Sequence, residues 1–148
     1  MDLRRWLAEG SIKTHDPSRP EIHRLLAVAD RDLKDASIKG LSVDRRFATA
    51  YAAALQLATV VLRASGYRAS SSAGGHHWRT IKLLPTLMGL QQQERGLYLD
   101  SCRRARNQGD YDRIGVVSES ELLELLGDAL GFRNEVLAWL STKHPDLT

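Results

Sequence analysis

The chain has 148 residues and a mass of 16.5 kDa, which is the usual size of one domain. Apolar residues make up 43% and charged residues 26%, as in an average globular protein. The single cysteine, Cys102, excludes an internal disulfide and a cysteine-based zinc cluster. The first residues hold no apolar run as long as a signal peptide, and no window approaches 18 uncharged apolar residues. We therefore expect a cytoplasmic protein with no membrane partner.

The positive charge is concentrated in the first three quarters of the chain. Residues 1–113 carry a net charge of +7 and residues 114–148 carry −4, which gives the overall +3. Most of the cations are arginines, whose guanidinium binds phosphate in a bidentate manner. From charge alone a solvated basic surface is the simpler explanation, but the excess is compatible with a nucleic-acid or nucleotide partner.

Almost every periodic segment in the first half has helical spacing. A short helix is expected over residues 2–8. Ser18 is the expected N-cap of a second helix, which Gly40 closes. Ser42 is the expected N-cap of a third, alanine-rich helix that ends at Gly66. The apolar stripes of these two helices are Ile22, Leu25, Leu26, Ala29, Leu33 and Ala36, and Phe47, Tyr51, Ala54, Leu55, Ala58, Val61 and Leu62.

The second half begins with a flexible loop over residues 68–75, rich in serine and glycine. A fourth helix is expected over residues 76–88, and Pro85 inside it predicts a kink or a split into two short pieces. The fifth helical segment covers residues 91–107. Gly109 then stands where a helix C-terminal glycine belongs.

A capping box, formed by Ser118 and Glu121, predicts the start of the last long helix. No segment has a convincing strand pattern. The sequence therefore predicts an all-α, up-and-down bundle of four principal helices with one or two short extra helices. We expect a single domain, with an N-terminal extension over residues 1–19 and a core over about residues 20–142.

The densest polar cluster lies at the end of the fifth helical segment, where four arginines fall within eleven residues. Cations in the last turn of a helix offset its dipole by a few tenths to ~1 kcal/mol each, which is enough to explain such a cluster. The functional alternative is an anion site in which arginine side chains hold a phosphate. The candidate contacts are Arg103, Arg104, Arg106, Asn107, Asp110 and Tyr111.

Two consecutive histidines, His76 and His77, stand at the expected start of the fourth helix. Neighbouring side chains on a helix point about 100° apart, so at most one of the two faces a given site. Either is a candidate for substrate binding. The alternative is that one packs against Trp78 or Arg79 while the other is solvated.

The sequence offers no motif for a metal or a cofactor, and we expect none. The two histidines are adjacent and lack a carboxylate at the spacing of zinc ligands. Gly74 and Gly75 are not followed by the Gly-Lys-Ser/Thr of a phosphate loop. Cys102 lies beside arginines that could lower its pKa, but catalytic thiol chemistry also needs a positioned histidine and an oxyanion site. We expect Cys102 to be buried and structural.

Three short segments occur in the order and spacing of a known family. They are Arg46-Phe-x-x-Ala-Tyr-x-Ala-Ala-Leu55, Gly75-His76-His77 and Arg106-Asn107-x-x-x-Tyr111. With them the chain resembles the HEPN superfamily, the higher eukaryotes and prokaryotes nucleotide-binding domain, over about residues 20–142. Many of its members are small bacterial toxins encoded beside a minimal nucleotidyltransferase antitoxin.

The resemblance implies a metal-independent endoribonuclease, the toxin component of a toxin–antitoxin or defence pair. Arg106 would hold the scissile phosphate of the RNA, and Asn107 would orient it. Active members carry a histidine where this chain has Tyr111, and a tyrosine with an ordinary pKa of about 10 is a poor base near neutral pH. Three explanations stay open: the tyrosine is tolerated, a neighbouring histidine substitutes, or the domain binds without cutting.

In the last case the domain would bind RNA or nucleotide as the partner or substrate of a nucleotidyltransferase, with the Tyr111 hydroxyl as an acceptor for modification. The resemblance also implies a homodimer. We predict that Arg106 and Tyr111 of both chains line one basic cleft. Facing arginines repel, so apolar contacts must hold the dimer together and bound phosphate should strengthen it.

Overall fold

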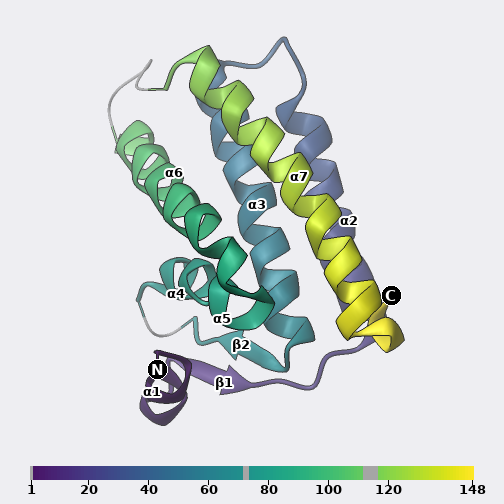
Figure 1. Cartoon of the computed structure of the whole chain (residues 1–148). Helices are drawn as coiled ribbons and strands as arrows, with labels where there is room; N and C mark the ends of the chain where they lie inside the picture. The colour runs from purple at the N-terminus through teal and green to yellow at the C-terminus, as the bar shows by residue number, and fades with distance from the viewer. Residues whose placement is uncertain (1, 72–73, 112–116) are drawn as a thin grey trace.

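The computed structural model describes residues 2–71, 74–111 and 117–148, and for residues 108–111 it describes the backbone without the side chains. Four long helices run alternately up and down beside one another (Figure 1). This arrangement confirms the predicted all-α bundle of four principal helices. They are α2 (Arg19–Ala36), α3 (Val43–Ala64), α6 (Gln93–Tyr111) and α7 (Glu119–Lys143).

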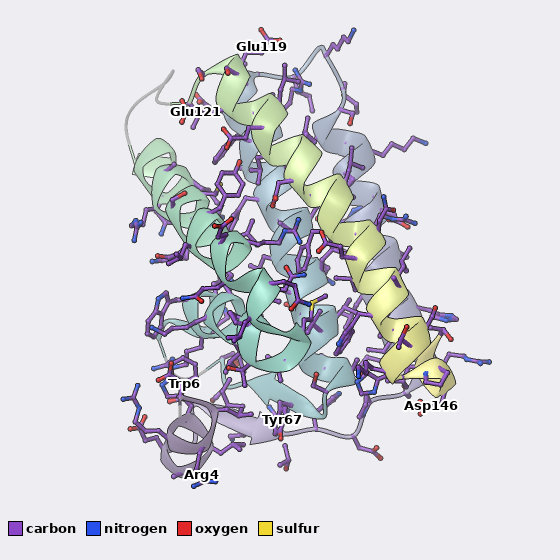
Figure 2. The ribbon with its side chains drawn as sticks, viewed as in Figure 1. Arg4, Trp6, Tyr67, Glu119, Glu121 and Asp146 are labelled. Atoms are coloured by element: carbon purple, nitrogen blue, oxygen red, sulfur yellow. The ribbon has the colours of Figure 1, made fainter. Side chains whose placement is uncertain are left out.

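The predicted helix starts at Ser18, Ser42 and Ser118 are confirmed. The hydroxyl of each accepts a hydrogen bond from the backbone N–H three residues later. The Glu121 carboxylate also accepts from the Ser118 N–H at 3.1 Å, which completes the capping box. Glu119 and Glu121 lie together at this end of α7 (Figure 2), where the helix dipole stabilises negative charge.

α3 is the central helix and packs against α2, α6 and α7. Its buried alanines, including Ala50, Ala53 and Ala54, let the neighbouring helices approach closely. By length and composition α3 is the one helix among the described residues that could cross a membrane. However, 61% of its most apolar window is buried inside the protein, which is the behaviour of a core helix, and length and composition alone are weak grounds for a span.

Short helices connect α3 to α6. The expected split at Pro85 is confirmed, because α4 (His76–Lys82) and α5 (Leu84–Met88) are separate helices with the proline in the first turn of α5. The 3-10 turn η1 (Leu90–Gln92) precedes α6, and the 3-10 turn η2 (Pro145–Leu147) follows α7.

Two expected helix ends are wrong. α2 ends at Ala36 and not near Gly40. At this end the Ser37 N–H bonds to the Lys34 carbonyl three residues back and tightens the last turn. α6 continues through Gly109 to Tyr111. A glycine costs a helix only ~1 kcal/mol relative to alanine, so it does not by itself stop a helix.

The N-terminal part holds a small sheet that the sequence did not predict. α1 (Asp2–Glu9), close to the expected 2–8, is followed by β1 (Ile12–Thr14), which pairs antiparallel with β2 (Tyr67–Ala69). The expectation of no strand is therefore wrong. Strands of three residues are too short to show an alternating pattern, and this pair joins distant parts of the chain. A second small core lies here, and its buried residues are Trp6, Ile12, Leu62 and Leu83.

A polar network joins the loop after β1 to two helices. His15 Nε2 lies 2.8 Å from Glu21 Oε1, and Arg63 Nη1 donates to Glu21 Oε2 at 2.7 Å. Burial raises the pKa of Glu21, but the hydrogen bonds and charges of His15 and Arg63 outweigh it and leave the pKa below its ordinary value. The network therefore holds the loop to α2 and α3 through an ionised carboxylate.

Candidate anion-binding site

α6 presents the predicted arginines in different directions. The Arg104 side chain is 64% exposed and that of Arg103 is 26% exposed. Asp100 accepts hydrogen bonds from both, from Arg103 Nε at 2.9 Å and from Arg104 Nη1 at 2.8 Å. Asp100 thereby fixes the position of Arg103. Asp100 is not among the residues predicted from the sequence, although spacings of three and four residues are the signal of such ion pairs on a helix.

Tyr51, from α3, lies beneath this cluster. Its ring is 1% exposed, and Arg106 Cζ lies 5.8 Å from the ring centroid, within range of a cation–π contact. Burial raises the pKa of Tyr51 to about 12, although the charges of Arg103 and Arg106 act in the opposite direction. The hydroxyl is therefore protonated at neutral pH. It is buried, and it makes no hydrogen bond to any atom in the described part of the chain. The described residues therefore leave this hydroxyl as a donor that is available to an anion at the cluster.

His77 lies in the first turn of α4, a helix that packs against α6. Burial lowers the pKa of His77 below its ordinary value of 6.5, and the charges of His76, Arg106 and Arg103 lower it further. The imidazole is therefore neutral at pH 7. The rings of His76 and His77 meet edge to face with centroids 4.2 Å apart. The structure thus brings one of the two predicted histidines, His77, into the field of the predicted arginines.

The turn before His77 is held by the N-terminal helix. Arg79 donates a hydrogen bond to the carbonyl of Gly74, and its guanidinium lies 5.7 Å from the Trp6 ring centroid. Trp6 also contacts Trp78, with ring centroids 5.6 Å apart. In Figure 2 Trp6 lies at the end of the molecule opposite Glu119. α1 therefore supports the segment that carries the histidines.

Arg106 also lines a surface hollow of about 290 Å³ between the start of α3 and the end of α6. Its walls include Asp44 and Arg45 from α3 and Val117, the residue before the α7 cap. The hollow gives the neighbourhood of Arg106 access to solvent, which a ligand needs.

The other predicted site residues are placed in part. Asn107 is half-buried on α6. The side chains of Asp110 and Tyr111 lie outside the described residues, so their roles stay predictions. The structure therefore groups Arg103, Arg106 and His77 and adds Asp100 and Tyr51, which the sequence analysis assigned no role in the site.

Cys102 has the structural role that was predicted. It is 4% exposed, and burial raises its pKa to about 11 despite hydrogen bonding with Tyr98 and Ser101. A thiol with this pKa is protonated at neutral pH and is a poor nucleophile. In the described ranges no three or more His, Cys, Asp or Glu side chains gather in the manner of metal ligands.

Comparisons of the chain with protein-family models, with curated proteins and with solved structures find no match. The short motifs and the geometry of this cluster are therefore the grounds for a function.

Proposed function

We propose that this protein is a HEPN-type, metal-independent endoribonuclease, the toxin component of a bacterial toxin–antitoxin or defence system. The observation that supports the proposal best is that α4, which carries His77, packs against α6, so that the charges of Arg106 and Arg103 act on the imidazole. These cations, together with burial, keep the imidazole neutral and able to accept a proton at pH 7. They also supply the positive charge that a phosphodiester needs in its transition state.

The reaction follows from these roles. A ring nitrogen of His77 accepts the proton of the RNA 2′-hydroxyl, and the 2′ oxygen forms a bond to the adjacent phosphorus. The bond from phosphorus to the 5′ oxygen breaks, and that oxygen takes a proton from water. The products are a 2′,3′-cyclic phosphate and a 5′-hydroxyl. Arg106 and Arg103 stabilise the charge that builds on the phosphate oxygens. In this proposal His77 replaces the histidine whose place Tyr111 occupies.

The proposed active form is a homodimer in which Arg106 and Tyr111 of both chains line one cleft. The apolar contacts that it requires are offered by α7, where Leu123 and Leu130 are 56% and 50% exposed. They are seven residues apart and so lie on one helix face. Val117, just before this helix, lines the hollow beside Arg106. Light scattering at tens of micromolar should give the mass of a dimer, and Leu123→Glu should give the mass of a monomer.

The test of the nuclease is cleavage of transfer RNA by the purified full chain in excess chelator. We expect wild type to cut. His77→Gln should lose at least about a hundredfold in rate because the general base is removed. Arg106→Ala should lose about as much because a cation that stabilises the transition state is removed. Arg31→Ala, which removes an exposed arginine from α2, is the matched control and should cut like wild type. Intact RNA after incubation with wild type, or equal cutting by Arg106→Ala, would refute the proposal.

The second candidate is a domain that binds RNA or nucleotide without cutting it, as partner or substrate of a nucleotidyltransferase. The tyrosine in place of the motif histidine favours it. This candidate predicts RNA affinity that Arg106→Ala weakens, without cleavage by wild type. It also predicts a nucleotidyl group on Tyr111 after co-expression with the neighbouring gene, which mass spectrometry of the intact chain detects.

A further inference from the structure

A second cavity, of about 420 Å³, lies between α4–α5 and α6. Most of its wall is apolar and comes from Trp78, Ile81, Pro85 and the leucines 90 and 97. The two leucines are 79% and 68% exposed, which is unusual for large apolar side chains unless something covers them. Gln93, Asp100 and Lys82 add an amide, a carboxylate and an ammonium group to this wall, and Lys82 Nζ lies 5.1 Å from the Trp78 ring centroid. The volume is in the range of small-molecule sites.

The cavity adjoins the anion-binding site at one residue, Asp100. Asp100 lines the cavity and at the same time accepts the hydrogen bonds of Arg103 and Arg104. A ligand that fills the cavity therefore reaches the carboxylate that holds the Arg103 and Arg104 side chains.

We propose that this cavity binds the nucleobase of a nucleotide whose phosphate occupies the Arg103–Arg106 cluster. The inference deepens the proposed function and rests on it for the position of the phosphate. A nucleobase has two apolar faces and a polar edge, and the cavity offers the complement of both. Trp78 and the leucines can contact the faces, since aromatic and aliphatic walls stack on any base. Gln93 and Asp100 can hydrogen-bond to the edge, and this polar pair gives the site a preference among bases.

Charge favours a nucleotide over a second copy of the chain as the occupant of the cavity. A nucleotide brings its phosphate to the basic end of the cavity, where Arg103 and Arg104 exceed the single charge of Asp100. A second copy would have to bring an acidic group to the same point. The test below distinguishes the two.

The experiment is calorimetry of the full chain with each of the four nucleoside 3′-monophosphates and with inorganic phosphate as probes. Gly96 lines the cavity, and a Cβ there would lie 3.6 Å from the carbonyl oxygen of Ile81, an ordinary contact. Gly96→Leu therefore fills the cavity, and Gly96→Ala is its matched control. Gln93→Trp fills it from an exposed position and keeps the test valid if Gly96→Leu does not fold.

We expect wild type and Gly96→Ala to bind at least one monophosphate about tenfold or more tightly than inorganic phosphate. The filled variants should lose this preference while they bind inorganic phosphate as wild type does. The proposal is overturned if no monophosphate binds more tightly than phosphate, or if the filled variants keep the preference. It is also overturned if filling the cavity only dissociates a dimer, as light scattering would show. RNA cleavage is measured in parallel. If the chain binds monophosphates through this cavity but does not cut RNA, the proposed ribonuclease activity is refuted and the proposed nucleobase site is not.

Discussion

Removing the Tyr51 hydroxyl should have opposite effects on the stability of the protein and on its affinity for phosphate. A buried hydroxyl without a hydrogen-bond partner costs about 1–3 kcal/mol, and the structure gives Tyr51 no such partner in its described part. Tyr51→Phe removes that cost and should raise the free energy of unfolding by about 1 kcal/mol, or the melting temperature by about 2–4 °C for a chain of this size. The same change should weaken inorganic phosphate binding by about tenfold, since a hydrogen bond to a charged group contributes ~1.5 kcal/mol or more.

Tyr98→Phe is the matched control. The Tyr98 hydroxyl is hydrogen-bonded to Cys102, so its removal should lower the free energy of unfolding by ~1 kcal/mol. It should leave phosphate affinity unchanged. Thermal unfolding and phosphate calorimetry of the two variants test whether the Tyr51 hydroxyl donates to a bound anion. If Tyr51→Phe is destabilised like Tyr98→Phe, or binds phosphate as wild type does, the hydroxyl is not a donor to the anion.

Three further outcomes follow from the structure. Burial alone would raise the pKa of Glu21, but its two hydrogen-bonded partners lower it. Denaturant unfolding should therefore find Glu21→Gln less stable than wild type at pH 7, and the difference should vanish as the pH falls below 4.5 and the carboxyl becomes protonated. Trp6→Ala should speed hydrogen exchange in α1, β1 and α4 while α3 and α7 stay protected, because Trp6 belongs to the small core and not to the bundle core. The acid limb of the RNA-cleavage rate should lie below pH 6.5, and Arg103→Gln should move it to higher pH, since the charge of Arg103 helps to lower the pKa of His77.

Local signals in the sequence were enough to predict most of the fold. The serine caps, the apolar stripes and Pro85 each act within one or two turns of helix, and each is found where it was expected. The pairing of β1 with β2 is decided by tertiary contacts, and strands of three residues leave no pattern to detect. At Gly109 the local signal is misleading: a glycine predicts a helix end there, but α6 continues to Tyr111.

The types of residue in the site could be predicted from the sequence, but which of them lie close together in the fold could not. The sequence predicts Arg103, Arg106 and both histidines as candidates, but the choice of His77 over His76 depends on how α4 packs against α6. Tyr51 was assigned to the core from its spacing, which is right for its ring. The contact of its ring with Arg106 depends on how α3 packs against α6.

The central claim is that His77, Arg103 and Arg106 form one anion-binding site, and a titration of the histidine rings by nuclear magnetic resonance tests it most directly. Spectra of wild type and of His77→Gln assign the His77 signal, and His15, bonded to Glu21, is the internal control. We expect the pKa of His77 to lie below 6.5 in the free protein and to rise when inorganic phosphate is added, because a bound anion stabilises the imidazolium. The rise should be absent in Arg106→Ala. A His77 pKa that phosphate leaves unchanged in wild type, or that rises equally in Arg106→Ala, would contradict the account.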